Sequence, residues 1–173
     1  MAEARIYVAC LASYNAGILH GAWIDAHQSA DDIQAAVHEM LASSREPFAE
    51  EWAIHDYEGF GSLSLSEWES FERVAAIAAG IAEYGTAFAA WLSYDSTRDP
   101  SDTRAFEDAY RGEWDSLHDY AEDWAESTGL YDLAEKAQSP YITVDIDLLE
   151  RDLDIEMYRV DSDNGIYVFD PNV

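Results

Sequence analysis

Carboxylates are the residues of this chain with the greatest capacity for chemistry. The 173 residues include 36 Asp and Glu but only nine Lys and Arg, so the formal net charge is −27. Carboxylates at this density attract cations and basic surfaces, and they repel nucleic acid, phosphorylated ligands and anionic membranes. A chain that folds alone gains nothing from so much self-repulsion. The charge therefore predicts a basic partner, and it argues against direct binding to nucleic acid or to a membrane.

The spacing of the acids is most regular between residues 115 and 126. Four of them recur at steps of four, three and four positions, which places them on one face of a helix. They are Asp115, Asp119, Glu122 and Glu126, with Asp123 beside them. At about 1.5 Å per residue they span roughly 16 Å of helix axis, over which one strand of B-DNA places about five phosphates. A helix of this sequence would approach the linear charge density of a DNA strand.

These acids could also be the ordinary charged outer face of an amphipathic helix. Ordinary faces mix charges of both signs, however, whereas no Lys or Arg lies between Glu113 and Glu135. Like charges four residues apart destabilise a helix by a few tenths of a kcal/mol each. Because the sequence forgoes this stability repeatedly, we favour a functional role for the charge over simple solvation.

Catalytic and metal-binding motifs find little support in the sequence. His55, Asp56 and Glu58 could form an acid–base or metal cluster, but neither they nor the other four histidines have metal-ligand spacing. Nucleophile-elbow, P-loop and dinucleotide-binding patterns do not occur. The single cysteine, Cys10, has apolar neighbours and is expected to be buried. We therefore predict a protein without catalytic residues, metal or cofactor.

The composition is that of a folded protein, because 49% of the residues are hydrophobic and 13% are aromatic. The longest uncharged apolar run, Val74 to Ala82, is far shorter than the roughly 20 residues that span a bilayer. The N-terminal sequence MAEARIYVACLASY lacks the basic leader and the cleavage site of a signal peptide. We therefore expect a cytoplasmic protein.

Charge and pattern divide the chain into three expected modules of an α+β protein. Residues 1–60 carry a net charge of −8, residues 61–100 one of −4 and residues 101–173 one of −15. In the first module, two strands joined by a turn with Asn15 and Gly17 precede a helix and a third strand, which predicts a three-stranded antiparallel sheet with one helix. The expected ranges are 5–11, 18–26, 29–41 and 51–57, with Ser29 as the helix cap.

The second module is expected to contain helices only. Ser66 and Glu69 match a capping box, which predicts the start of a helix that continues through FERVAAIAAGIAEY. Gly80 and Gly85 interrupt this segment. We therefore predict two or three short helices here rather than one long helix.

The third module combines helical, strand and hairpin patterns. Apolar residues recur at steps of three and four along residues 102–127, which predicts helical structure that ends at Gly129. The segment YITVDIDL after Pro140 alternates apolar and acidic residues, so we expect a strand. MYRV and IYVF flank DSDNG, and the pair Asn164 and Gly165 predicts a terminal hairpin with a type I′ turn.

Several segments resemble, in order and spacing, the ArdA antirestriction proteins carried by phages, plasmids and conjugative transposons. IYVACLASYNAGILHGAWIDA is followed by EWAIHDYEGFG and, near the C-terminus, by YITVDIDLLERDL and the GIYVF hairpin. The most specific matches are Tyr7, Asn15, Gly17, Gly21, Ala22, Trp23, the block Ala53–Glu58, and Tyr141, Ile142, Arg151, Asp152 and Leu153 of the segment called the antirestriction motif. Between Gly61 and Pro100 the resemblance rests on charge and helix content.

This resemblance implies an elongated, curved homodimer that imitates bent B-form DNA and occupies the DNA groove of a type I restriction-modification enzyme, on its methyltransferase core. It also implies three small modules, of which the C-terminal one dimerises. Incoming mobile DNA would thereby escape restriction. The carboxylates that we expect to imitate phosphates are Asp102, Glu107, Asp108, Asp115, Asp119, Glu122, Asp123, Glu126, Asp145, Asp147, Glu150 and Asp152.

The C-terminal hairpin region is a candidate dimer interface, because it mixes apolar and aromatic residues. The candidates are Ile155, Met157, Tyr158, Tyr167 and Phe169. An equally good interpretation is that these residues form the core of their own module. Loss of the hairpin would change the hydrodynamic mass only under the first interpretation.

Two other functions fit the charge. A halophile-type cytoplasmic protein is also acidic and poor in lysine, as here with Lys136 alone, but its charge is spread over the whole surface. An acidic inhibitor or chaperone of another basic DNA-binding protein would share the field but not the full-length ArdA pattern. A need for molar salt to fold would favour the first, whereas partner binding that moderate salt abolishes would favour DNA mimicry.

Overall fold

The structure, a computed structural model, describes residues 3–173 and consists of two compact units. We call them unit 1, which ends at Thr103, and unit 2, Arg104–Val173. The described residues form eight helices and two three-stranded antiparallel sheets, which confirms the α+β class. A module boundary near residue 60 stays a prediction. Met1 and Ala2, at the start of the segment where we expected no signal peptide, lie outside the described residues.

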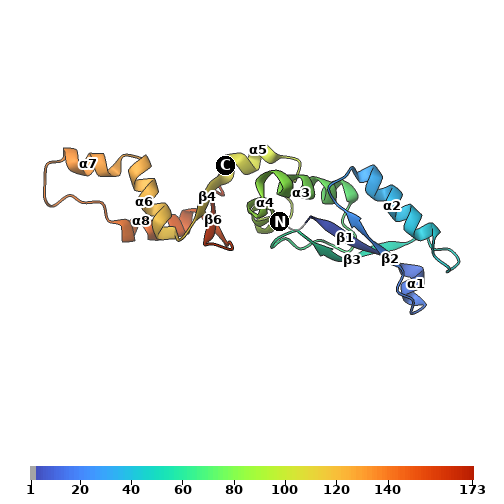
Figure 1. Ribbon diagram of the computed structural model, residues 1–173. Helices are drawn as coiled ribbons and strands as arrows, with labels where there is room; N and C mark the ends of the chain where they lie inside the picture. The colour runs from blue at the N-terminus through green and yellow to red at the C-terminus, as the bar shows by residue number, and fades with distance from the viewer. Residues whose placement is uncertain (1–2) are drawn as a thin grey trace. The chain divides into compact units, whose positions relative to one another are not determined.

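Unit 1 is built on a sheet of strand order β2-β1-β3 (Figure 1). Its elements are β1 (Arg5–Cys10), α1 (Leu11–Asn15), β2 (Gly21–Asp25), α2 (Ala30–Ala42), β3 (Trp52–Glu58), α3 (Phe71–Tyr84) and α4 (Thr86–Tyr94). Val8 and Ile54 of the sheet and Val37 of α2 are buried. Ser29 caps α2 by accepting a hydrogen bond from the Asp32 N–H at 3.1 Å. The three strands and the helix predicted for this region are confirmed.

The connection between β1 and β2 differs from the predicted turn, because residues 11–15 form the short helix α1. The Ala16 N–H donates to the Ala12 carbonyl at 3.2 Å, as in a helix. Ser13 is buried, and its Oγ lies 2.9 Å from Ser44 Oγ, in the segment that follows α2. This contact between distant parts of the chain favours the helix, and a local turn pattern cannot reveal it.

Helices α3 and α4 differ from the prediction in where the first begins and in the place of Gly80. The Ser66–Glu69 box forms a turn, in which Glu69 Oε2 accepts from the Ser66 N–H at 3.4 Å, and α3 begins later, capped by Ser70. Gly85, at φ +73°, separates the two helices as predicted, but Gly80 lies within α3. A Cβ atom on Gly80 would overlap the ring of Phe88, so close packing requires this glycine. Among the described residues, no helix has the length and apolar character needed to cross a membrane.

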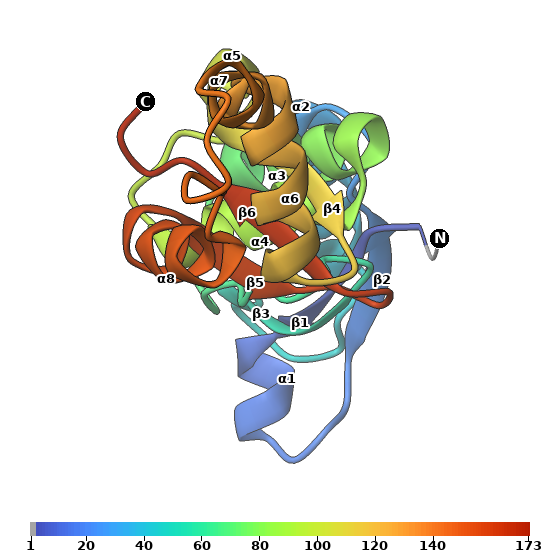
Figure 2. The same cartoon turned by 90° about the vertical axis from the view of Figure 1, so that its left-hand side faces the viewer.

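Unit 2 combines a sheet of strand order β4-β6-β5 with two packed helices, α6 and α8 (Figure 2). Its elements are α5 (Thr103–Ala109), β4 (Tyr110–Trp114), α6 (Leu117–Ser127), α7 (Leu130–Lys136), α8 (Ile146–Glu156), β5 (Tyr158–Asp161) and β6 (Ile166–Phe169). Helices and sheet share one buried cluster, formed by Leu117, Tyr120, Ala121, Leu153 and Val168. The predicted end of helical structure at Gly129 is confirmed for α6.

The helical structure predicted along residues 102–127 is wrong in its middle. Tyr110–Trp114 form the strand β4, in which Trp114 lies opposite Ile166 of β6. The ring of Tyr110 stacks on Phe106 of α5 with 5.2 Å between centroids. The apolar stripe therefore runs from a helix into a strand. Pairing with a strand near the C-terminus decides this, and the spacing of neighbouring residues does not show it.

The strand predicted at residues 141–148 is also wrong, because α8 begins at Ile146. Asp145 caps this helix and accepts a hydrogen bond from the Leu148 N–H at 3.0 Å. Ile146 and Leu153, seven positions apart, both pack in the core of unit 2. The alternation of acidic and apolar residues is therefore an N-cap and the first turn of a helix.

The C-terminal hairpin of β5 and β6 is confirmed, but its turn is not type I′. Neither Asn164 nor Gly165 has the positive φ that such a turn requires. The loop between the strands closes instead with a hydrogen bond from the Ser162 N–H to the Gly165 carbonyl at 2.8 Å. A Cβ atom on Gly165 would overlap the carbonyl oxygen of Trp114. The close approach of β4 therefore explains the glycine.

Candidate functional site

The carboxylates predicted to imitate phosphates lie mainly in unit 2. Asp102 belongs to unit 1, and of all twelve only Glu150 is partly buried, with 36% of its side chain exposed. Unit 2 holds Glu107 and Asp108 on α5, Asp115 before α6, Asp119, Glu122, Asp123 and Glu126 on α6, Asp145 at the α8 cap, and Asp147, Glu150 and Asp152 on α8. Helices α6 and α8 pack against each other, so these two acidic helices are neighbours. Seven of the twelve predicted carboxylates lie within α6 and α8, and we call these seven the α6–α8 acidic surface.

Helix α6 carries four acids within eight residues. Its buried side is formed by Leu117, Tyr120, Ala121 and Ala125, and its four acids are exposed. From the first acid to the last, the helix rises about 10.5 Å, which corresponds to about three phosphate spacings along one DNA strand. Asp115 precedes the N-cap Ser116, so it does not belong to this helical face as predicted. The row is shorter than predicted, but its charge density is retained.

Local capping interactions position these acids. Ser116 Oγ accepts a hydrogen bond from the Asp119 N–H at 3.2 Å and so begins α6. Asp119 and Asp147 occupy the first turns of α6 and α8, where the helix dipole favours negative charge. The helix ends therefore offset part of the repulsion among the carboxylates.

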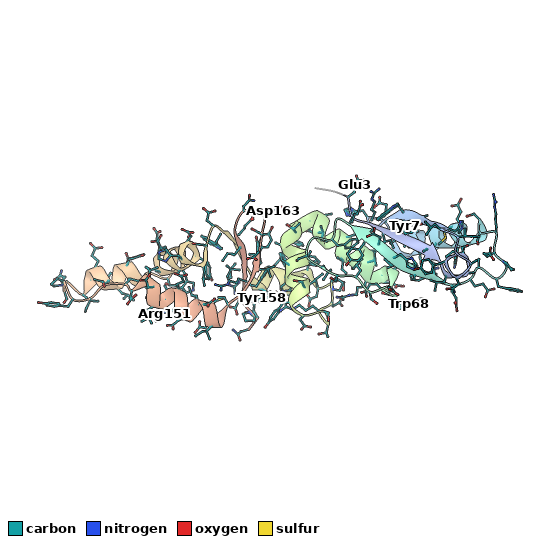
Figure 3. The ribbon with its side chains drawn as sticks, turned by 90° about the horizontal axis from the view of Figure 1, so that it is seen from below. Glu3, Tyr7, Trp68, Arg151, Tyr158 and Asp163 are labelled. Atoms are coloured by element: carbon teal, nitrogen blue, oxygen red, sulfur yellow. The ribbon has the colours of Figure 1, made fainter. Side chains whose placement is uncertain are left out.

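Few positive charges neutralise this surface. The arginine ion pairs of unit 2 are Arg104–Asp108 at 3.7 Å, Arg111–Asp170 at 3.0 Å and Arg159–Asp154 at 2.6 Å. Arg151 of α8 (Figure 3) directs its Nε to the Asp147 carbonyl at 3.4 Å. Within residues 3–173, no ion pair joins a Lys or Arg to an acid of α6. Asp108 is thus partly neutralised, whereas α6 keeps its charge.

His118 lies among the carboxylates, in the first turn of α6. Its Nδ1 is 3.0 Å from Glu150 Oε2, and its Nε2 is 3.7 Å from Glu122 Oε1. The hydrogen bond to Glu150, together with the charges of Glu150, Glu122 and Asp147, raises the pKa of His118. The imidazole contact therefore links α6 to α8.

Two more exposed acids of α8, Asp154 and Glu156, were not predicted as part of the site. The signal that could have found them is the helical spacing of Ile146 and Leu153, which the apolar–acidic alternation obscured. Asp154 accepts the ion pair from Arg159, so its charge is partly neutralised. Glu156 is a further exposed carboxylate at the C-terminal end of α8.

The residues proposed for a dimer interface differ in their exposure. Phe169 and Tyr167 are buried, with 1% and 9% of their surface exposed, and Met157 packs against the core. Tyr158 (Figure 3) is half-buried and stacks on Phe169 with 6.1 Å between centroids. Ile155 is 84% exposed. The hairpin residues therefore belong to the core of unit 2, and Ile155 is the candidate most available for contact.

Unit 2 also has an apolar groove of about 580 Å³, between α7, the segment after it and the start of α8. Helix α7 buries none of its residues, although it contains two leucines. The residues that form most of the groove are Leu130, Leu133, Ala134, Ile142, Val144 and Leu148. Leu133 and Ile142 are 62% and 52% exposed. The groove is therefore an apolar surface next to the acidic one.

The possible acid–base cluster on β3 is occupied by other contacts. His55 packs edge-on against the ring of Tyr14, with 4.8 Å between centroids. Glu58 forms an ion pair with Arg5 at 2.7 Å, which joins β3 to β1. These contacts assign His55 and Glu58 to the structure of the sheet.

Comparison with known proteins identifies one relationship. No protein with a curated description matches the chain. The family model described as antirestriction protein (ArdA) matches residues 6–168, nearly the whole chain. The matched range contains the sheet of unit 1 almost entirely and all of α6, α7 and α8.

Proposed function

Because this chain belongs to the ArdA family of antirestriction proteins, we propose that it inhibits type I restriction-modification enzymes by imitating DNA. Antirestriction implies an interaction with restriction enzymes. In this proposal the protein occupies the DNA groove of the methyltransferase core, acts by binding rather than by catalysis, and does so in the cytoplasm of a bacterial host. The observation that carries the proposal is the α6–α8 acidic surface, whose α6 acids meet no Lys or Arg in the described part of the chain.

Electrostatics supplies the binding energy in this proposal. The DNA-binding groove of an enzyme directs Lys and Arg side chains at the phosphates of DNA, and the release of counterions drives association. A protein polyanion with similar charge spacing gains the same energy without any base contact. Two copies of the chain carry twice −27, or −54, which is comparable with about 27 base pairs at two phosphates each. The charge is therefore sufficient for a long footprint.

We propose further that the protein is a homodimer joined through unit 2. The apolar groove supports this proposal, because α7 has no residue buried within its own unit. Two copies of the same acidic chain repel each other, so burial of apolar surface must hold them together. Salt should therefore strengthen the dimer while it weakens binding to the enzyme. Analytical ultracentrifugation at two salt concentrations measures the first effect.

A displacement experiment tests the mimicry directly. The protein is titrated into a type I methyltransferase core that already holds labelled DNA, at low and at moderate salt. We expect displacement that moderate salt weakens, because screened charges compete less well for basic residues. A variant with Asp119, Glu122, Asp123 and Glu126 changed to Asn or Gln should displace the DNA poorly.

A matched control removes the same charge from unit 1. Four exposed carboxylates there, Glu39, Glu50, Glu51 and Glu83, can be changed to Gln together. We expect this control to retain more inhibition than the α6 variant. Failure of the wild-type protein to displace DNA would contradict mimicry and favour another basic partner. Loss of folded structure in dilute buffer would favour a halophile-type protein.

A further inference from the structure

Three side chains of the kinds that bind transition metals converge where α6 meets α8. They are the imidazole of His118 and the carboxylates of Asp147 and Glu150, and one ligand atom of each lies within 4.8 Å of the other two. We propose that these residues bind a divalent transition metal ion of the Zn²⁺ type, which bridges the two helices. The site does not depend on the proposed inhibition of restriction enzymes.

The separations of the ligand atoms suit a single ion. Metal–ligand bonds to nitrogen and oxygen are about 2.0–2.2 Å, so two ligands of one tetrahedral ion lie about 3.3–3.6 Å apart. His118 Nδ1 and Glu150 Oε2 are 3.0 Å apart. Small rotations of exposed carboxylates can bring the third ligand, Asp147, to the same spacing.

The two helices hold the ligands on a rigid base. Asp147 and Glu150 are three positions apart on α8, which places them on one side of that helix. His118 directly follows Leu117, which is buried in the cluster that also contains Leu153 of α8. The core of unit 2 therefore fixes the spacing of the two helices that carry the imidazole and the carboxylates.

A fourth residue, Glu122, lies near the imidazole and can orient it. Glu122 Oε1 lies 3.7 Å from His118 Nε2, whereas Glu150 contacts the other ring nitrogen, Nδ1. Histidines that bind metals commonly direct their other ring nitrogen to a carboxylate, which selects the tautomer that leaves the first nitrogen free to bind. Glu122 can serve this role through Nε2–H while Nδ1 binds the ion. Glu122 is thus a positioning residue and not a ligand.

The donor set selects among cations. Imidazole nitrogen suits Zn²⁺, Co²⁺, Ni²⁺ and Cu²⁺, whereas Mg²⁺ and Ca²⁺ take oxygen ligands. A strongly acidic protein attracts Mg²⁺ loosely at many places. Tight binding of one transition metal ion per chain, in preference to Mg²⁺, would distinguish this site from that diffuse attraction. If His118 serves only as an ion-pair partner of the carboxylates, this preference will not be seen.

Cobalt titration of the full-length, untagged protein tests the site, because Co²⁺ bound to nitrogen and oxygen ligands has visible absorption bands. We expect saturation near one Co²⁺ per chain in excess Mg²⁺, and loss of the bands when Zn²⁺ is added. Since even residues that only orient a ligand change metal affinity by about 10- to 100-fold, His118→Gln and Glu150→Gln should each weaken binding by at least about tenfold. Glu122→Gln should have a smaller effect.

Two control variants remove the same chemical groups elsewhere. Glu126→Gln removes one charge from α6, and His38→Gln removes an exposed imidazole from unit 1, so both should bind Co²⁺ like the wild type. Circular dichroism of each variant checks that it is folded. Unchanged affinity in folded His118→Gln, or Co²⁺ binding by the wild type that excess Mg²⁺ abolishes, would overturn the proposal. Neither result bears on DNA displacement, which is measured separately.

Discussion

Units 1 and 2 carry similar net charges on very different cores. Unit 1 has 17 acidic and four basic residues. Unit 2 has 19 acidic and five basic residues on a shorter segment of the chain. Among the described residues, 26 apolar residues are buried in unit 1 but only ten in unit 2. Unit 2 therefore concentrates charge where there is less apolar burial to offset the repulsion. The comparison shows that the acidic surface lies on the unit with the smaller apolar core.

The largest effect on folding is expected when a buried side chain is truncated in the core of either unit. Leu153→Ala in unit 2 and Ile33→Ala in unit 1 both truncate a buried aliphatic side chain, at a cost of about 2–5 kcal/mol each. We expect the first change to unfold unit 2 and to abolish inhibition, while unit 1 stays folded. The second change should leave both units folded at low temperature. Limited proteolysis with mass spectrometry locates the unfolded region, and equal sensitivity of the two units would break the comparison.

Charge removal from α6 should affect binding and stability in opposite directions. The fourfold change of Asp119, Glu122, Asp123 and Glu126 should weaken enzyme binding by about 1–4 kcal/mol in total, at roughly 0.2–1 kcal/mol per exposed charge. It should also stabilise unit 2 slightly, because like charges along a helix repel. Any single change should barely matter. Displacement assays and urea unfolding measure the two effects, and a fourfold variant that inhibits fully would remove α6 from the proposed site.

The ion pair between Arg111 and Asp170 should make the stability of unit 2 depend on pH. The Asn172 N–H and the Arg111 guanidinium hold the pKa of Asp170 below its usual range. A carboxyl group with a lowered folded-state pKa stabilises the fold above its unfolded pKa, and this stability is lost as the pH falls through the folded value. Asp170→Asn should therefore cost about 1–2 kcal/mol at neutral pH.

The same variant predicts how the difference changes in acid. The wild type and Asp170→Asn should converge in unfolding free energy as the solution becomes strongly acidic, because the wild-type carboxyl group is then neutral as well. Urea unfolding across pH measures this convergence. A difference that persists in acid would show that Asp170 acts through shape rather than charge.

The smallest expected effect is that of salt on the stability of the two units. Added NaCl screens repulsion between exposed charges, so it should stabilise unit 2 more than unit 1, by less than about 1 kcal/mol. Thermal unfolding followed by proteolysis of each unit measures the difference. Equal stabilisation of both units would show that charge density does not distinguish them.

Local patterns were sufficient for much of the fold. Each strand of the first sheet has its own apolar pattern, Ser29 caps α2, and the segments MYRV and IYVF form a hairpin as predicted. These features depend on residues close together in the chain, whose propensities the sequence shows directly. The acidic character of the site was equally clear, because exposure of carboxylates follows from their cost of burial.

The features that sequence missed depend on contacts between distant residues. Tyr110 joins a strand because β6 lies beside it, and Gly80 continues a helix because Phe88 packs against it. For Tyr167 and Phe169 the sequence left two interpretations open, and their burial selects the core of unit 2.

The sequence by itself determined the charge, the α+β class and most local elements, since these follow from composition and from neighbours in the chain. Only the tertiary structure decided that α6 meets α8 and that His118 of one helix lies 3.0 Å from Glu150 of the other. The physical reason is that packing of apolar residues far apart in sequence sets those positions, and no local pattern contains that information.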